Sequence, residues 1–365
     1  MKPEALPQFL FGTDAVLRFE KSIQIHFTEK RQVLSSSPLN GGYREDLSGV
    51  FNFDETPAKG RNCVMRAPTY EQHMQIVAKE LGFDPAHCAG LSTAAHMKYA
   101  ASVSDSYNGT TVTAIVTGGI NKNGGRAGDP ASWDERAFND ANRQHGTVNI
   151  ILAVDSHLSE GAMTKAVITA TEAKTAAIQE LLAQSFYSDG LATGTGTDGI
   201  MVIANPQSGI YLTDAGQHSK LGELIGSTVL AAVKRALYLQ TGLGYQQQHN
   251  VFCRMRRFGV TEQALTERFM EYKPSPEQLR LFRQNIKKMA LQDELLTYTS
   301  LYAHLLDQLK WGMLSVPEAI CAGNRLLCLM NMEYRISDLS DNGYAEMIAQ
   351  YQNGLFDKMV GNVLE

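Results

Sequence analysis

The chain has 365 residues, of which 44% are hydrophobic and 19% are charged, as in an ordinary globular protein. This length is enough for one large hydrophobic core or two smaller ones. The 33 basic and 38 acidic side chains give a net charge of −5, and no block of like charges stands out. Nucleic acid and anionic membrane surfaces are therefore not expected partners.

The start of the chain, MKPEALPQFLFGTDAVLRFEK, has prolines and acidic residues where a signal peptide would carry a basic end and an apolar run. No segment approaches the roughly 18 consecutive apolar residues that a membrane span requires. We therefore expect a cytoplasmic protein.

The five cysteines form no CxxC pair, which argues against a disulfide framework and against a structural zinc site. Cys321 and Cys328 are seven positions apart and would share one face of a helix. We expect them to pack there as small apolar groups. The sequence predicts no metal site.

Short apolar runs between glycine-rich breaks indicate strands in the first part of the chain. Residues 15–19 and 22–27 alternate in polarity around a short polar turn and predict a hairpin. Residues 111–116, 147–154 and 199–204 are nearly continuous apolar runs rich in β-branched side chains. Such runs are typical of strands that are covered on both faces.

Helical periodicity lies between these runs, over residues 70–81, 160–184 and 219–240. This mixture predicts an α/β or α+β fold, in which helices flank a layered β-sheet. Because the hairpin comes early and the helices later, we favour a mixed sheet over a doubly wound parallel one.

The last part of the chain reads as helical. Of the 31 glycines, 25 fall in residues 1–245, which leaves six for the rest. Ser275 with Gln278, and Ser315 with Glu318, fit capping boxes that begin helices. We expect a catalytic domain over 1–245 and a helical domain or extension over 246–365.

Two glycine-rich loops follow predicted strands, which are QVLSS at 32–36 and the apolar run at 111–116. SSSPLNGGYRED, at 35–46, exposes hydroxyl and backbone N–H groups, although a simple Pro and Asn-Gly turn would explain it as well. TGGINKNGGRAGDP, at 117–130, has five glycines that allow its backbone to approach a ligand closely. Asp129 lies near the end of this second loop.

Polar residues also occur within or beside predicted elements. Asn149 lies inside an apolar strand, where bracing neighbouring loops is the favoured role over facing a pocket. Glu172 and Lys174 are two positions apart on a helix, so they point to different faces, and a solvated lysine is the plain interpretation. His218 precedes Ser219, the expected N-cap of a helix, which favours a neutral imidazole able to accept a proton.

TGTGTD, at 193–198, ends on Asp198 immediately before an apolar strand. Either the segment is a tight turn entering that strand, or it is a loop that holds a polar reacting group. The chain contains no GxxxxGK[ST], HExxH or GxSxG pattern, so phosphoryl transfer, zinc proteolysis and α/β-hydrolase chemistry lose support.

Over residues 30–240 the chain resembles the adenosylcobinamide amidohydrolase family. The segments that carry the resemblance, in this order, are SSSPLNGG, VTGGINKNGGRAGD, GTVNIIL, TEAKTAA, TGTGTD and HSKLGELIG. The resemblance implies cleavage of the amide that joins aminopropanol to the corrin ring of adenosylcobinamide, giving adenosylcobyric acid. It implies a small-molecule corrinoid, which contains cobalt, as the substrate, and no required cofactor.

Amide hydrolysis needs a nucleophile, donors for the oxyanion and an acid for the departing amine. We expect Asp198 or Asp129 to activate water and His218 to protonate the amine, with Glu172 as a further catalytic candidate. A nucleophilic Ser36 or Thr195 is the competing mechanism. The expected substrate-binding residues are Asn40, Gly41, Gly42, Asn121, Asn123, Asn149, Lys174, Thr195 and Thr197.

Other functions stay open at this point. A corrinoid carrier or sensor without enzymatic activity would use the same loops to grip the ring, and an amidase for another substrate would share the chemistry. The helical part after residue 245 has no counterpart in the basic family domain. It either completes a shared core, covers the face of the corrin as a lid, or provides a homo-oligomer contact.

Overall fold

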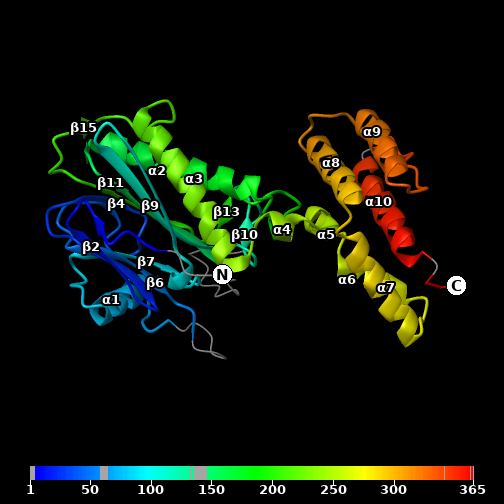
Figure 1. The fold of residues 1–365 in the computed structure, drawn as a ribbon, viewed down its shortest axis with the longest axis horizontal. Helices are drawn as coiled ribbons and strands as arrows, with labels where there is room; N and C mark the ends of the chain where they lie inside the picture. Colours follow the sequence, from blue (N-terminus) through cyan, green and yellow to red (C-terminus); the bar gives the residue numbers. More distant parts are fainter. Residues whose placement is uncertain are drawn as a thin grey trace. The chain divides into compact units, whose positions relative to one another are not determined.

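The computed structural model describes residues 5–57, 65–131, 134, 146–340, 342–361 and 363–364. The chain divides into two compact units, Met1–Gly244 and Tyr245–Glu365. The first contains the β-sheets and three long helices, and the second is helical throughout its regular structure (Figure 1). The predicted fold class is therefore confirmed. No helix in the described part of the chain is long and apolar enough to cross a membrane.

A six-stranded mixed sheet forms the centre of the first unit. Its strand order is β5-β4-β14-β11-β9-β8, and only β11 and β14 pair in parallel. The strands are β4 (Gln32–Ser35), β5 (Gly42–Arg44), β8 (Ala101–Tyr107), β9 (Thr110–Gly119), β11 (Thr147–Val154) and β14 (Gly199–Ala204). The three apolar runs predicted as covered strands are β9, β11 and β14.

A second, five-stranded sheet packs against one face of the first. Its order is β1-β2-β3-β6-β7, with β6 and β7 parallel. The strands are β1 (Phe9–Leu10), β2 (Asp14–Arg18), β3 (Ser22–His26), β6 (Gly49–Asp54) and β7 (Cys88–Thr93). Strands β2 and β3 form the predicted hairpin. Buried aliphatic side chains of both sheets, such as Ile25, Val50, Ile151 and Met201, form the core between them.

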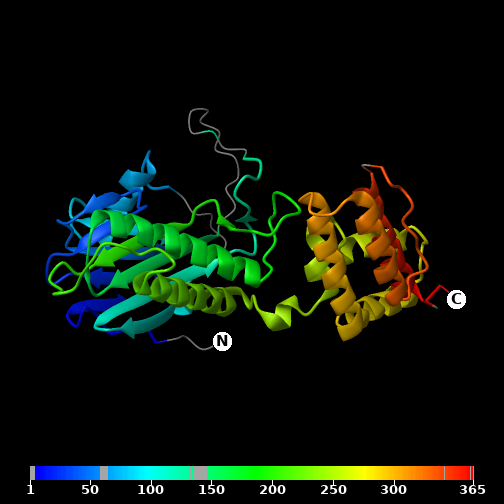
Figure 2. The ribbon, with the colours of Figure 1, turned by 90° about the horizontal axis from the view of Figure 1, so that it is seen from above.

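Helices cover the two outer faces. Helices α2 (Glu160–Glu180) and α3 (Lys220–Thr241) lie side by side on the six-stranded sheet (Figure 2), and α1 (Tyr70–Glu80) packs on the five-stranded sheet. The hydroxyls of Thr69, Ser159 and Ser219 cap these helices by accepting a backbone N–H of the first turn. The three helices confirm the sequence prediction.

One edge of the two-sheet stack gathers the glycine-rich loops. The starts of β11 and β14 meet the ends of β9 and β4 there, because Asn149 is level with Thr117 and Gly199. The ends of β6 and β7 reach the same edge, since Asn149 hydrogen-bonds to Asn52 and Ser92 across the sheets. We call these strand ends and their attached loops the loop edge.

Four two-residue strands tie loops together. They are β10 (Gly124–Gly125) with β13 (Gly194–Thr195), and β12 (His157–Leu158) with β15 (Tyr211–Leu212). The first pair joins the two glycine loops at 117–130 and 193–198 into one surface. Segments that are far apart in the sequence are thereby fixed relative to one another.

The second unit packs its helices around a separate apolar core, which includes Phe269, Phe282 and Tyr351. The helices are α4 (Tyr245–Gln248), α5 (Val251–Met255), α6 (Glu262–Met270), α7 (Pro276–Met289), α8 (Asp293–Lys310), α9 (Val316–Leu329) and α10 (Gly343–Val360). Both predicted capping boxes are present, at the starts of α7 and α9.

The two cysteines of α9 differ from the sequence prediction. Cys321 and Cys328 are both exposed rather than packed as apolar groups. The spacing correctly placed them together on one helix, but periodicity alone does not say which face of a helix meets the core. Here the buried side of α9 contains Ile320 and Leu327, each one position before a cysteine.

Candidate active site

Asp198 accepts hydrogen bonds from its own TGTGTD loop and from the neighbouring strand β11. Its Oδ1 accepts the Thr195 hydroxyl at 2.6 Å and the backbone N–H of Val148 at 2.9 Å. Its Oδ2 accepts the backbone N–H of Thr195 at 3.1 Å and the ammonium of Lys174. Each of these donors complements a negative charge, and together they hold the carboxylate in place. The segment is more than a tight turn, because its backbone is organised around this one side chain.

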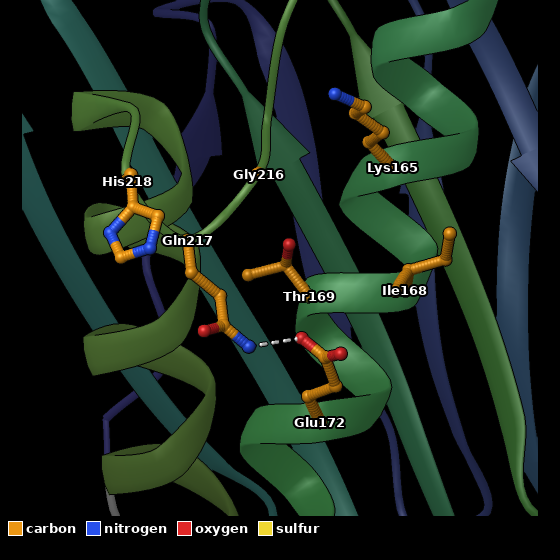
Figure 3. Close-up of a pocket in the computed structure, with 7 residues that line it drawn as sticks. All are labelled: Lys165, Ile168, Thr169, Glu172, Gly216, Gln217 and His218. Carbon is orange, nitrogen blue, oxygen red and sulfur yellow. Dashed lines mark hydrogen bonds between the residues drawn. The ribbon is translucent and has the colours of Figure 1, made fainter.

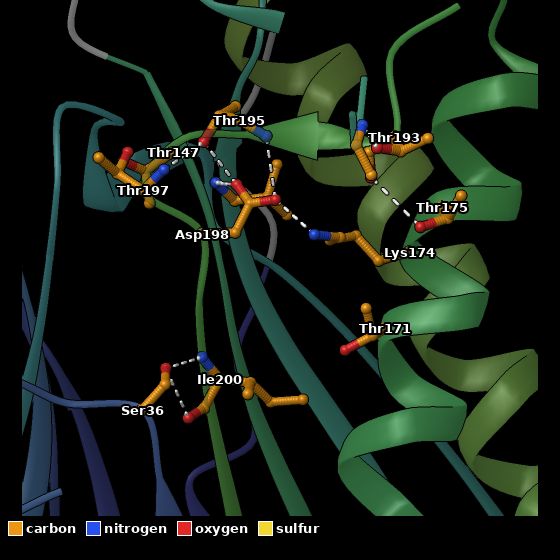
Figure 4. Close-up of polar contacts among 12 residues, drawn as sticks. Ser36, Thr147, Thr171, Lys174, Thr175, Thr193, Thr195, Thr197, Asp198 and Ile200 are labelled. Carbon is orange, nitrogen blue, oxygen red and sulfur yellow. Dashed lines mark hydrogen bonds and ion pairs between the residues drawn. The ribbon is translucent and has the colours of Figure 1, made fainter. Parts of the chain in front are cut away.

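Lys174 reaches Asp198 from helix α2, and both side chains are largely buried, at 12% and 14% exposed (Figure 4). A Cβ atom at position 194 would lie 2.3 Å from Asp198 Oδ2 and 2.8 Å from Lys174 Nζ. A side chain at position 194 would therefore force one of the two charged groups to shift. The solvated lysine that sequence reasoning gave as the plain interpretation is not what the fold contains.

Thr171 and Thr175 extend the polar surface along α2 next to Lys174 (Figure 4). The Thr175 hydroxyl donates to the carbonyl of Thr193 at 3.2 Å, which ties the helix to the TGTGTD loop. On the other side of that loop, the hydroxyls of Thr197 and Thr147 lie 2.8 Å apart. Hydroxyl groups therefore flank the Asp198–Lys174 pair on both sides.

Ser36 lies on the same face of the six-stranded sheet as Asp198. Its hydroxyl accepts the backbone N–H of Ile200 at 2.9 Å, and Ile200 is two residues beyond Asp198 on β14 (Figure 4). Among the described residues, no carboxylate or imidazole bonds to the Ser36 hydroxyl. Of the two predicted nucleophiles, only Thr195 has a basic group as its hydrogen-bond partner.

Asp129 lies on the loop that β10 and β13 join to the TGTGTD segment. Its Oδ2 accepts the Ser185 hydroxyl at 2.6 Å and the backbone N–H of Arg126 at 2.7 Å. Burial alone would raise the pKa of Asp129, but hydrogen bonds from Ser185, Ser188 and Arg126 outweigh it and lower that pKa. The carboxylate therefore secures its own loop close to the site.

The asparagines and glycines of the first two loops brace the backbone. The Asn40 amide donates to the carbonyls of Pro85 and Cys88, each at 2.7 Å. Asn40 and Gly42 have left-handed backbones, with φ of 52° and 86°. A Cβ at Gly41 would lie 2.2 Å from the Ser37 carbonyl. This geometry accounts for the Asn-Gly-Gly turn without a ligand.

Asn123 and Asn121 behave differently. Asn123 is buried and donates to the carbonyl of Gly146 at 2.6 Å, which joins the glycine loop to the start of β11. Asn121 is exposed at the tip of that loop. Of the two candidates for a substrate-facing asparagine, only Asn121 has its side chain open to solvent.

Asn149 has the bracing role that the sequence favoured. Its amide donates to Asn52 Oδ1 and to the Ser92 carbonyl, each at 2.8 Å, and Asn52 in turn donates to the Thr117 hydroxyl. The chain of bonds runs between the two sheets, where the side chain is 1% exposed. It fixes the loop edge instead of facing a pocket.

His218 and Glu172 lie in a different depression, between α2 and the start of α3 (Figure 3). Gln217 donates to Glu172 there at 2.5 Å. Neither Asp198 nor Asp129 is among the residues that line this depression. Glu172 and Lys174 contact different partners, as helix geometry predicted. The structure thus brings together Asp198, Lys174, Thr195 and Thr197, but it does not bring His218 to them.

Sequence reasoning missed a carboxylate–imidazole pair at the loop edge. His96 Nδ1 lies 3.0 Å from Oδ2 of Asp54, although 42 positions separate the two residues along the chain. Asp54 ends β6, and His96 comes shortly after the end of β7. Neither β6 nor β7 was among the predicted strands, so the sequence analysis had no signal that would bring these two residues together.

Comparison with known proteins gives the family of the chain. Residues 10–245 match the family model described as adenosylcobinamide amidohydrolase. An uncharacterised protein of Methanocaldococcus jannaschii is 34% identical over 62% of this chain and 89% of its own length. An adenosylcobinamide amidohydrolase of Methanosarcina mazei is 29% identical over 56% of this chain and 90% of its own length.

The alignment with a solved protein of Pyrococcus horikoshii covers 65% of this chain and 80% of the length of that protein. The sequence identity is 12% and the TM-score is 0.30, which is too low to support any argument. The family match covers every site residue named above and ends where the helical unit begins. The chain therefore belongs to the adenosylcobinamide amidohydrolase family.

Proposed function

We propose that this protein hydrolyses the amide between aminopropanol and the corrin ring of adenosylcobinamide, releasing aminopropanol and adenosylcobyric acid. The family match supports the substrate class. The observation that carries the chemistry is the cluster of Thr195, Asp198 and Lys174, in which a hydroxyl, a carboxylate and an ammonium are in direct contact. An unactivated amide needs these kinds of group, a nucleophile with a base and a cation for developing charge.

The hydrogen bonds favour Thr195 as the nucleophile. Its hydroxyl donates to Asp198, which can take the proton as oxygen attacks the amide carbonyl. Lys174 can then stabilise negative charge or donate a proton to the departing aminopropanol. Passage of the first proton from Asp198 through Lys174 to aminopropanol leaves the carboxylate ionised. It can then accept a proton from the water that cleaves the ester and return that proton to the Thr195 oxygen.

Direct attack by water is the alternative, with Asp198 as the base and Thr195 orienting the water. Both routes use the same cluster and differ in whether an ester to the protein forms. His218, Glu172 and Asp129 remain candidates at the margin of either route, for example in contacting the large substrate. Neither route requires a resident cofactor.

The proposal is tested with purified protein and adenosylcobinamide. Aminopropanol release is measured by mass spectrometry for the natural chain and for Asp198→Asn, which keeps the shape and removes the charge. We expect turnover to fall by about 10² to 10⁴ for this variant. Asp105→Asn, on exposed strand β8, is the control and should keep full turnover.

A carrier or sensor would give a different result. It would change the absorption of the bound corrin without releasing aminopropanol from any corrinoid offered. An amidase for another substrate would leave adenosylcobinamide intact but cleave a different member of a corrinoid panel. Full turnover by Asp198→Asn would remove the cluster from the mechanism.

A further inference from the structure

The pair formed by Asp54 and His96 has no part in the mechanism proposed above. The Asp54 carboxylate is 2% exposed and the His96 imidazole is 44% exposed. A buried carboxylate is therefore the partner of an accessible imidazole ring. Asp54 Oδ1 also accepts the backbone N–H of Thr56 at 2.7 Å, and Lys21 Nζ lies 3.5 Å from Oδ2. These contacts of Oδ1 and Oδ2 hold the carboxylate in place where it meets the ring.

The orientation of the ring decides which nitrogen is available. A carboxylate can only accept, so His96 Nδ1 carries the hydrogen and Nε2 keeps its lone pair in the neutral ring. The backbone of His96 is held as well, since its N–H donates to Gln240 at 3.1 Å. Within the described part of the chain, Nε2 has no hydrogen-bond partner, which leaves a lone pair at an accessible position.

This arrangement is the one that proteins use for histidine as a metal ligand. Ligating histidines generally donate their other ring N–H to a carboxylate, which fixes the tautomer and strengthens the ring as a donor. Carboxylate–imidazole pairs also serve in proton transfer. Whether the pair serves in metal binding or in proton transfer depends on where it lies relative to the Thr195–Asp198–Lys174 cluster.

The two groups lie at the same loop edge but on different sheets. Asp198 belongs to the face of the six-stranded sheet that α2 covers, while Asp54 belongs to the five-stranded sheet. Packed sheets are about 10 Å apart. Among the described residues, no hydrogen bond joins His96 to the Thr195–Asp198–Lys174 cluster. A ligand that used both groups would have to span the gap between them.

A series of contacts connects His96 with the Thr195–Asp198–Lys174 cluster. Asn52 and Asn149 bridge the sheets. Gln240, which holds the His96 backbone, lies beside Gly119, where a Cβ would be 3.7 Å from its side chain. Gly119 in turn pairs with Thr147, whose hydroxyl contacts Thr197 in the TGTGTD loop. This series of contacts connects the imidazole with the cluster.

We propose that His96 Nε2 coordinates the cobalt of the corrinoid substrate while the scissile amide lies at the Thr195–Asp198–Lys174 cluster. This inference rests on the proposed function, because it takes a corrinoid as the substrate. Cobinamide has no nucleotide base, so one axial position of its cobalt is open to an external ligand. The imidazole would replace the water bound there, with no change of oxidation state. A single metal–nitrogen bond would then set the distance from ring to amide.

The test is electron paramagnetic resonance of cob(II)inamide bound anaerobically to the full-length protein. A single nitrogen ligand splits each cobalt line into three. We expect this splitting in the natural chain and its loss in His96→Ala. His87→Ala is the matched control, since His87 is also exposed and faces a carboxylate, Asp46, at 3.6 Å. This control should keep the splitting.

Asp54→Asn is the second variant, in case His96→Ala does not fold. It keeps His96 but replaces the ionised partner, and we expect corrinoid coordination to weaken about 10- to 100-fold. The proposal is overturned if the natural chain binds cob(II)inamide without nitrogen splitting, or if His96→Ala retains it. Reduced aminopropanol release in His96→Ala with an unchanged spectrum would assign the pair to another role and also overturn the proposal.

Aminopropanol release from adenosylcobinamide, measured in parallel, separates this proposal from the function on which it rests. Nitrogen splitting without hydrolysis would refute the amidase and leave the cobalt ligand in place. Hydrolysis without splitting in the natural chain would support the amidase and refute the ligand.

Discussion

Thr195 is the residue at which the two hydrolytic routes differ. Its hydroxyl donates to Asp198 at 2.6 Å, and its own backbone N–H donates to the other carboxylate oxygen at 3.1 Å. The backbone contact does not depend on the side chain. Replacing the side chain therefore removes the hydroxyl but keeps the second of the two hydrogen bonds that Thr195 donates to the carboxylate.

We expect Thr195→Ser to retain most of the turnover and Thr195→Ala to lose about 10² or more if the hydroxyl attacks the amide. The measurement is aminopropanol release, followed by mass spectrometry of the protein for a corrinoid ester. Direct attack by water predicts instead that no ester accumulates in any variant. An alanine variant with nearly normal turnover would exclude Thr195 as the nucleophile.

Asp129 gives a prediction about pH. Its lowered pKa means that the ionised carboxylate stabilises the folded protein above the ordinary aspartate pKa, and that this contribution is lost as the pH falls through the folded pKa. We expect Asp129→Asn to destabilise the chain at pH 7 and to have a smaller effect below about pH 3. Urea unfolding of both proteins at the two pH values measures this. If the two proteins differ in free energy of unfolding by the same amount at both pH values, the predicted dependence on ionisation of Asp129 is wrong.

At the scale of elements, the TGTGTD loop contains one close approach, between the backbone at Gly194 and the Asp198–Lys174 ion pair. A Cβ at Gly194 would lie 2.3 Å from Asp198 Oδ2, whereas a Cβ at Gly196 would meet nothing within 4 Å. The two glycines are thus a matched pair in one loop. Gly194 lies against the ion pair, and Gly196 is exposed.

We expect Gly194→Ala to displace Lys174 or Asp198 and to reduce aminopropanol release by at least about tenfold, because misplacing reacting groups by about 1 Å can cost a hundredfold. Gly196→Ala should leave turnover within about twofold. Circular dichroism checks that both variants fold. Equal activity in the two would show that the ion pair tolerates displacement.

The bonds between the sheets lead to a stability prediction. Asn149→Ala removes the donor to Asn52 and Ser92 inside a region that water does not reach. We expect a loss of about 1 to 3 kcal/mol in the free energy of unfolding, since buried acceptors are left unpaired. The exposed Asn121→Ala should change it by less than about 0.5 kcal/mol. Chemical denaturation measures both, and equal losses would argue against the bracing role.

At the scale of the whole molecule, the hydrophobic cores show which parts of the chain can fold separately. The buried clusters of Met1–Gly244 share no residue with the cluster of Tyr245–Glu365. Each unit therefore has its own apolar interior. All residues of the candidate site belong to the first unit.

We expect a chain that ends at Gly244 to fold on its own and to release aminopropanol from adenosylcobinamide. Thermal unfolding should show one cooperative transition, because the sheets and helices of this unit complete their own core. A shortened chain that folds but has lost corrinoid affinity would give the helical unit a role in substrate binding. Failure to fold would show that the units depend on each other.

The sequence by itself determined the long helices of the first unit, the early hairpin, three central strands and the family. Apolar periodicity located β9, β11 and β14, and hydroxyl caps and capping boxes located helix starts, because these signals are local and depend on neighbours a few positions apart. The order of the glycine-rich segments was enough for the resemblance. Chain order could not show which face of α9 is buried, and Cys321 and Cys328 were placed wrongly for that reason.

Only the tertiary structure decided which polar residues meet. It paired Lys174 with Asp198 and kept His218 in a separate depression, because the helix face and the sheet register set those distances. It also brought Asp54 to His96 by pairing β6 with β7 in parallel. Contacts between residues far apart in the chain follow from packing and register, and no short stretch of sequence contains that information.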